Sequence, residues 1–281
     1  SNASISDATG TLTITDDDAT PSLAINDVTA ANENAANSTF TVTLSAASGL
    51  AVTVNYATSD GTATAGADYT AISSTQLTIA AGATSATFNV AVLADSLDEA
   101  NETATLLSSV SSSATISDAT GTLTITDDDA TPSLSINDVT DDDEDADNST
   151  FTVTLSAAAG RDVTVAYATS NGTATAGADY TATSGTLTIS AGATSATFTV
   201  AVLADSLDEA NETVTLTLSS ASNATISDAT GTLTITDDDA TPSVDFNATS
   251  SSGAESVSSK ALTVDLSAAA GRDVTVAYAV T

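Results

Sequence analysis

The sequence predicts an all-β protein made of tandem seven-stranded immunoglobulin-like β-sandwiches. Apolar residues alternate with Thr or Ser through most of the 281 residues, and a period of two is typical of half-buried strands. Near-identical stretches recur about 110 residues apart, since TGTLTITDDD stands at Thr120–Asp129 and again at Thr230–Asp239. A repeat of this length is a whole domain rather than one rung of a solenoid. Seven short strands in such a length, separated by turn residues, indicate a sandwich.

The alternation identifies the seven strands of the second full repeat in order. They read SLSIN, TFTVTLS, DVTVAYAT, TLTIS, ATFTVAVL, ETVTLTLS and GTLTIT, each with apolar residues on one face. The expected strands are Ser133–Asn137, Thr150–Ser156, Asp162–Thr169, Thr186–Ser190, Ala196–Leu203, Glu212–Ser219 and Gly231–Thr236. The inward residues are expected to form the core, and these are Leu134, Ile136, Phe151, Val153, Leu155, Val163, Val165, Tyr167, Leu187, Ile189, Phe198, Val200, Val202, Val214, Leu216, Leu218, Leu233 and Ile235.

The repeats also predict the domain boundaries. One full repeat is expected at 19–129 and a second at 130–239, joined by little more than Ala-Thr-Pro. Residues 4–18 match only the last strand of a preceding repeat, and 240–281 match only the first three strands of a following one. Both partial repeats are expected to pair with something, because they carry apolar strand faces without a complete domain. Residues 1–3 are interpreted as the remnant of an expression tag.

The composition excludes several classes of function. The chain has 37 acidic residues against three basic ones, for a formal net charge of −34, so nucleic acids and anionic membrane surfaces are poor partners. It contains no His, Cys, Met or Trp, and no apolar run long enough to span a membrane. Disulfides, thiolate zinc sites and imidazole or thiol catalysis are therefore excluded, and we expect a protein that is not an enzyme. Carboxylates remain as the strong ligands, and they favour hard cations such as calcium or magnesium.

Strand direction predicts that most acidic residues of a repeat gather at one pole of the sandwich. Consecutive antiparallel strands alternate in direction, so the first, third and fifth connections and the end of the last strand share a pole. Converging carboxylates repel one another unless cations neutralise them. The acids in these segments are Glu33, Asp68, Asp95, Asp98, Glu99, Glu102 and Asp127–Asp129 in the first repeat, and Asp141–Asp145, Asp147, Asp179, Asp205, Asp208, Glu209, Glu212 and Asp237–Asp239 in the second.

Two interpretations of this acidic pole are open. Calcium takes six to eight oxygen ligands, which four converging segments can supply. Acid-rich loops can also be solvated turns, or a device for solubility or for adaptation to salt. The convergence of four separate segments favours calcium, although the additional acids Asp141–Asp143 are expected to be solvated.

Four motifs in order give the chain a resemblance to a known family. GTATAGADY at Gly172–Tyr180, the strand GTLTI, VLADSLDEANET at Val202–Thr213 and a closing TITDDD resemble the Calx-beta domain. That family occurs in the regulatory region of sodium–calcium exchangers, in an integrin β subunit and in tandem arrays of large bacterial surface proteins. The resemblance implies that calcium is bound by Glu33, Asp68, Asp95, Glu99, Glu102, Asp127, Asp128 and Asp129 in the first repeat, and by Glu144, Asp179, Asp205, Glu209, Glu212, Asp237, Asp238 and Asp239 in the second.

The chain departs from the family pattern at two places. Ala94-Asp95 and Ala204-Asp205 stand where the family often has two adjacent Asp residues. Asn101 and Asn211 stand where it often has another acid. These differences predict fewer ions per site or weaker binding.

The function expected from these features is that of a calcium-binding structural repeat. Calcium at one pole of each sandwich would stiffen the junction to the next repeat in a large extracellular or cell-surface protein, such as a bacterial adhesin. Its partners would be adjacent repeats of the same chain and calcium ions, without membrane insertion. The alternative is a regulatory calcium sensor like that of sodium–calcium exchangers. Affinity separates the two, at about 10⁻⁴–10⁻³ M for extracellular modules and about 10⁻⁷–10⁻⁵ M for sensors. Thr-x-Thr faces that bind a ligand or ice are a third hypothesis, but outward Thr is a common strand residue.

Overall fold

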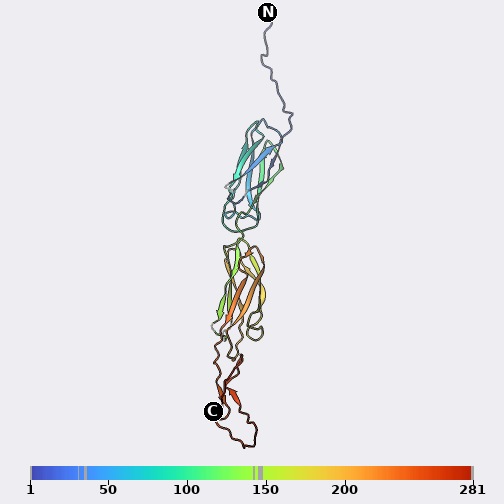
Figure 1. Cartoon of the computed structure of the whole chain (residues 1–281). Helices are drawn as coiled ribbons and strands as arrows, with labels where there is room; N and C mark the ends of the chain where they lie inside the picture. Colours follow the sequence, from blue (N-terminus) through green and yellow to red (C-terminus); the bar gives the residue numbers. More distant parts are fainter. Residues whose placement is uncertain (1, 31, 35–36, 142, 145–147, 280–281) are drawn as a thin grey trace. The chain divides into compact units, whose positions relative to one another are not determined.

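The computed structural model describes residues 2–30, 32–34, 37–141, 143–144 and 148–279. All regular elements in these ranges are strands, and within them no helix is long and apolar enough to cross a membrane. The chain forms two compact units (Figure 1). The first comprises Ser1–Ser96 and Ala100–Asp128, and the second comprises Leu97–Glu99 and Asp129–Thr281.

The first full repeat is a sandwich of two sheets. One sheet has the strand order β6-β3-β1-β8 and the other has the order β2-β9-β7-β4-β5. The strands are β1 (Ser22–Ile25), β2 (Val28–Thr29), β3 (Ser38–Leu44), β4 (Val52–Asp60), β5 (Thr75–Ile79), β6 (Ser85–Val90), β7 (Glu102–Ser112), β8 (Thr115–Asp118) and β9 (Thr120–Ile125).

The second full repeat has the same topology. Its sheets have the orders β15-β12-β10-β17 and β11-β18-β16-β13-β14. The strands are β10 (Ser133–Ile136), β11 (Val139–Asp141), β12 (Ser149–Leu155), β13 (Val163–Asn171), β14 (Ser184–Ile189), β15 (Ser195–Val200), β16 (Glu212–Ser222), β17 (Thr225–Ile226) and β18 (Thr230–Ile235). All seven strands expected from the sequence are present, so the prediction of tandem immunoglobulin-like sandwiches is confirmed.

Two short strands in each repeat were not expected. In the second repeat the chain leaves β10 at Asn137 and Asp138, crosses to the other sheet and pairs there in parallel with β18 as β11. The Asn137 side chain accepts a hydrogen bond from the Thr152 amide at 2.7 Å, and Asp138 accepts one from the Thr232 amide at 2.8 Å. These strands have only two to four residues, which is too short for a clear periodicity, and this explains why alternation did not reveal them.

The core of the second repeat lies between its two sheets. Of the expected inward residues, only Tyr167 and Leu187 are partly exposed, and both pack against the buried cluster. The ring of Tyr167 stacks on Phe198 with 3.9 Å between ring centroids. Ala159, Ala174 and Tyr180 are also buried, in connections that alternation does not cover. The Tyr180 hydroxyl donates to Asn171 Oδ1 at 2.7 Å, which satisfies its polar end.

The two partial repeats are largely exposed. β19 (Val244–Phe246) pairs with β20 (Val264–Leu266), but residues 273–279 form no strand and Tyr278 is 84% exposed. The expectation of three strands in 240–281 is therefore met only for two. In the full repeat the equivalent third strand, β13, pairs with β14 and β16. Residues 4–18 likewise form no strand. Ser1–Ala3 is identical to Ser222–Ala224, so this triplet fits the repeat as well as a tag.

Candidate metal centre

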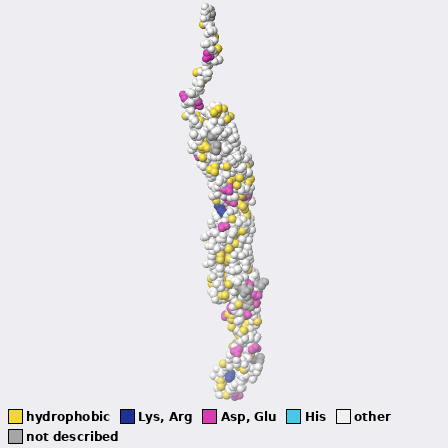
Figure 2. Space-filling model, turned by 180° about the vertical axis from the view of Figure 1, so that it is seen from behind, with side chains coloured by type: hydrophobic (Ala, Val, Ile, Leu, Met, Phe, Trp, Pro, Cys, Tyr) yellow, Lys and Arg dark blue, Asp and Glu magenta, His cyan; other side chains and the backbone are white. Residues whose placement is uncertain are grey.

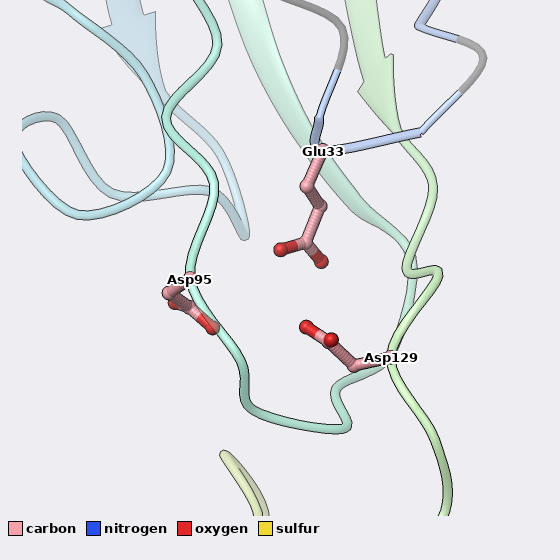
Figure 3. A group of neighbouring side chains, drawn as sticks. All are labelled: Glu33, Asp95 and Asp129. Atoms are coloured by element: carbon pink, nitrogen blue, oxygen red, sulfur yellow. The ribbon is translucent and has the colours of Figure 1, made fainter.

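Carboxylates from separate segments meet in two groups in each full repeat. In the second repeat Glu144, Asp237 and Asp239 form one group, and Asp179, Asp205 and Glu209 form the other. Within each group one oxygen from every residue lies within 4.8 Å of the others. The first repeat also has two groups, with a partly different membership. One is Glu33, Asp95 and Asp129, whose carboxylates point toward one another in Figure 3, and the other is Asp68, Glu99 and Glu102.

A tight turn after β13 positions Asp179. Gly177 has a φ of +89°, a left-handed conformation that glycine adopts without strain, and its amide donates to the Tyr180 carbonyl at 2.8 Å. Asp179 Oδ2 accepts the Thr175 amide at 2.6 Å. The Leu203 amide donates to the Asp179 carbonyl at 2.9 Å, which ties the turn to the segment after β15. The turn therefore brings an acid of one connection to the acids of another.

The segment after β18 is held by Asn211. The Asp237 amide donates to Asn211 Oδ1 at 3.3 Å, and Asp237 Oδ1 accepts the Glu209 amide at 2.9 Å. In the first repeat the Asp127 amide donates in the same way to Asn101 Oδ1, at 3.2 Å. The two asparagines were interpreted above as departures that weaken binding. The structure shows that their side chains fasten the acidic tail of the last strand.

Burial and mutual repulsion raise the pKa values of several acids of the second repeat. The pKa of Glu144, a side chain that is only 8% exposed, is raised to about 8 by burial and by the adjacent Asp239, Asp205 and Asp237. Burial and the neighbouring Asp179 raise the pKa of Glu212 to about 7. The pKa of Glu209 is raised too, first by burial and then by Asp205. Without a cation, the pole therefore holds protons near neutral pH.

The donor set fits a hard cation. Glu144 Oε1 and Asp239 Oδ2 are buried and accept no hydrogen bond from a donor among the residues that the structure describes, and the two carboxyls can share a hydrogen bond with each other only when one of them is protonated. Buried carboxylate oxygens without a donor leave a desolvation penalty that a cation would offset. The candidate donors are carboxylate oxygens, which suit calcium or magnesium rather than zinc. On the face shown in Figure 2, acidic side chains gather toward the ends of the sandwiches, whereas their sides are mainly uncharged.

Most of the residues predicted to bind metal are in these groups, and four are not. Within the described part of the chain, the groups leave out Asp127, Asp128, Glu212 and Asp238. Asp128 Oδ2 accepts a hydrogen bond from Asn34 Nδ2 at 2.9 Å. Glu212 lies close enough to Asp179 for that carboxyl to raise its pKa. The structure thus brings twelve of the predicted sixteen residues together, and their role as metal ligands stays a prediction.

Two acids expected at the acidic pole have different surroundings. Asp98 and Asp208 are buried and form ion pairs with Arg161 and Arg272, at 2.8 Å and 2.7 Å. Sequence reasoning missed these pairs, although Arg161 and Arg272 stand at equivalent positions, each preceded by Gly and followed by Asp.

A third acid, Asp141, was expected to be solvated, and this was wrong. Its side chain is 8% exposed and accepts a hydrogen bond from the Ser149 hydroxyl. The cause is the pairing of β11 with β18, which places Asp141 opposite Ile235 on the edge strand of the sheet. Asp142, Asp145 and Asp147, also expected at this pole, lie outside the described residues.

Comparison with known proteins identifies the repeated unit. The family model described as the Calx-beta domain matches residues 16–129, 127–239 and 237–281. A crystal structure of CBD12 from CALX1.2 is 18% identical, with a TM-score of 0.37, covering 76% of this chain and 99% of that one. The apo form of the Calx CBD1 domain is 23% identical, with a TM-score of 0.37, covering 39% of this chain and 100% of that one. No curated protein matches the chain.

Proposed function

The chain belongs to the Calx-beta family, and from this membership and the clustered carboxylates we propose that each full repeat is a calcium-binding structural module. The observation that carries the proposal is the pair of buried oxygens, Glu144 Oε1 and Asp239 Oδ2, which belong to residues of an all-carboxylate group. Such a group is costly to keep charged without a cation. A non-catalytic binding role accounts for it without any further chemistry.

Calcium would join segments that are far apart in the sequence. One ion could be held by Glu144, Asp237 and Asp239, and another by Asp179, Asp205 and Glu209, completed by backbone carbonyls or water. The ions would supply positive charge to a pole whose acids otherwise repel one another. The ions would link the connection between β10 and β12, the turn after β13 and the segment after β18 to one another.

We further propose that this pole stiffens the connection to the next repeat. The acidic tail ends at Asp239, and the next repeat begins at once with Ala-Thr-Pro at 240–242. An ion bound by Asp239 would restrict the residues that follow it. Tandem, nearly identical repeats suit a spacer, and millimolar calcium outside cells suits the affinity of extracellular modules, about 10⁻⁴–10⁻³ M. These arguments favour a large extracellular or cell-surface protein.

A thermal melt of the chain tests the proposal. It would be measured with EDTA, with millimolar CaCl₂ and with millimolar MgCl₂ at matched ionic strength. We expect a calcium-selective rise in melting temperature, because a ligand that binds only the folded state stabilises it by about 0.4–1.4 kcal/mol per site at about one to ten times its dissociation constant. Titration by calorimetry would give the affinity, and a value of about 10⁻⁷–10⁻⁵ M would indicate a sensor instead.

The control is a variant that removes one group in each repeat, Glu33→Gln/Asp129→Asn/Glu144→Gln/Asp239→Asn. It should melt higher than the wild type in EDTA, because repulsion is reduced, and should lose most of the calcium response. Equal shifts of the wild type with every salt would mean only screening of the net charge, and calcium binding would then be rejected.

A further inference from the structure

Two buried aspartates of the chain are paired with two of its three basic residues. Asp98 is 3% exposed and Asp208 is 4% exposed, which makes both as buried as core residues. A carboxylate at this depth is costly unless a cation or several donors satisfy it. Each stands in the sequence Leu-Asp-Glu, at Leu97–Glu99 and Leu207–Glu209, in the connection that also carries predicted calcium ligands. Arginine satisfies these two carboxylates.

The surroundings of Asp208 form a complete binding site for the turn after β20. Arg272 donates from Nη2 to Asp208 Oδ1 at 2.7 Å and from Nε to Asp208 Oδ2 at 3.2 Å, so the ion pair is bidentate. The Thr241 hydroxyl adds a hydrogen bond to Oδ1 at 3.1 Å. The Gly271 amide donates to the Asp208 backbone carbonyl at 3.2 Å, and Asp208 and Ala270 form an isolated parallel bridge. Backbone and side chain of one residue are thus both engaged.

The same arrangement recurs at Asp98, which lies in the second compact unit together with its partners. Arg161 donates from Nη2 to Asp98 Oδ2 at 2.8 Å, and the Thr131 hydroxyl donates to Oδ1 at 3.1 Å. The Gly160 amide donates to the Asp98 carbonyl at 3.2 Å, and Ala159, which bridges Asp98, is 1% exposed.

The glycine of the turn packs directly against the glutamate side chain of the tripeptide at both places. A Cβ on Gly271 would lie 2.0 Å from Glu209 Oε1, and a Cβ on Gly160 would lie 1.9 Å from Glu99 Oε1. The turn therefore approaches the Leu-Asp-Glu tripeptide so closely that a side chain would have to displace the glutamate. This close packing shows that the contact is specific. Non-specific attraction between an arginine and the acidic surface would not select one partner among the 37 acidic residues.

The contact at Asp208 does not need a folded third repeat. The described residues of this segment, 240–279, are mostly exposed and form only the pair β19–β20. The turn and Thr241 are nevertheless bound as in the complete repeat. The determinants are consequently local: a threonine before the first strand of a repeat and the Ala-Gly-Arg turn after its second long strand.

We propose that the Leu-Asp-Glu tripeptide of both full repeats is a docking element for the Ala-Gly-Arg turn of the repeat that follows in the sequence, and that the Asp–Arg ion pair locks this contact. The contact consists of protein groups alone and includes no metal ligand other than the neighbouring glutamate. It goes beyond calcium binding, because it holds successive repeats to each other when calcium is absent.

Hydrogen exchange of the full chain, followed by mass spectrometry in EDTA, tests the proposal. The informative amides are those of Ser267 and Gly271, which donate to Ser243 and Asp208. Arg272→Leu and Asp208→Asn should each speed their exchange about tenfold or more, because each breaks a hydrogen-bonded charge pair. The double variant should be no faster than the faster single variant. Leucine is suitable because Leu50 occupies the equivalent position of the first repeat.

The matched control is Lys260→Leu, which removes the same charge from the same segment without touching Asp208. It should leave the exchange of Gly271 unchanged. The proposal is overturned if Arg272→Leu and Lys260→Leu have equal effects, or if these amides exchange at the free-chain rate in the wild type in EDTA. A wild type that is protected in EDTA but shows no calcium response would reject calcium binding and leave the docking contact standing.

Discussion

At the scale of single residues, the acidic pole of the second repeat holds protons on the oxygens that the proposed calcium ions would bind. Burial and neighbouring carboxylates raise the pKa of Glu144 to about 8 and that of Glu212 to about 7, against an ordinary value of 4.5. At neutral pH without metal, both groups hold protons for much of the time. A calcium ion must displace those protons, so binding should release them and weaken as the pH falls.

The pH dependence of stability follows from the same two groups. Because their folded pKa values exceed the unfolded value, the folded state binds more protons, and this stabilisation is lost as the pH rises through the folded pKa. In EDTA we expect the melting temperature to fall between about pH 5 and about pH 8. With saturating calcium the fall should disappear, because the carboxylates are then neutralised by metal. Melts at several pH values with and without calcium measure both effects. An EDTA melting temperature that rises over this range would contradict the assignment.

Glu144 itself can be tested by a nearly isosteric change. Glu144→Gln removes a charge from the group with Asp237 and Asp239, so the pH-dependent loss of stability in EDTA should become smaller. Calcium affinity of the second repeat should fall about tenfold or more, since one charged ligand is lost. Calorimetric titration measures the affinity, and Glu255→Gln, an exposed acid of the partial repeat, is the matched control. Equal effects of the two variants would show that only net charge matters.

At the scale of elements, turns and strand ends place the acids. The turn that holds Asp179 depends on Gly177 at a φ of +89°. Gly177→Ala should lower the free energy of unfolding by about 1 kcal/mol or more, because alanine is strained at positive φ. It should also weaken calcium binding by shifting Asp179. Denaturant melts in EDTA and calcium measure the two effects separately. Gly253→Ala, at an exposed position with open space around it, should change neither.

The strands supply the rigidity that keeps these turns in place. Leu216 on β16 is fully buried, whereas its neighbour Thr217 is exposed on the other face of the sheet. Leu216→Ala should lower the free energy of unfolding by about 2–5 kcal/mol, since it leaves a cavity in a packed core. Thr217→Ala should change it by less than about 0.5 kcal/mol. Urea melts of the two variants compare them directly, and similar losses would contradict the assigned faces of β16.

At the scale of the whole molecule, charge is the dominant property. A net charge of −34 on 281 residues favours unfolding through self-repulsion. In EDTA, NaCl should therefore raise the melting temperature steadily up to about 1 M, where the screening length is about 3 Å. Calcium should produce its effect at concentrations far too low for screening. A melting temperature in EDTA that does not change with NaCl would show that the acids are spaced widely enough in solvent.

The strands and core of this molecule were predictable to within a few residues, because each strand carries its own period-two pattern. The pole was predictable as well, because the direction of successive strands places their connections without any knowledge of side chains. The prediction was least accurate where contacts are specific. Asp141 is buried because a three-residue strand crosses between sheets, and Asn211 holds the tail of β18 although its position suggested a lost ligand.

By itself, then, the sequence determined the repeat, the sandwich, the inward faces and the side of the sandwich at which the carboxylates collect. These four features follow from the local alternation of apolar and polar residues and from the order of the strands. The near-identical copies of the repeat make both patterns easy to recognise. Only the tertiary structure decided which carboxylates face each other and which face an arginine. Asp208 and Glu209 are neighbours in one loop, yet one pairs with Arg272 and the other joins an acidic group. The direction in which each side chain of a loop points depends on the groups that pack against the loop. Those groups come from residues that are distant in the sequence.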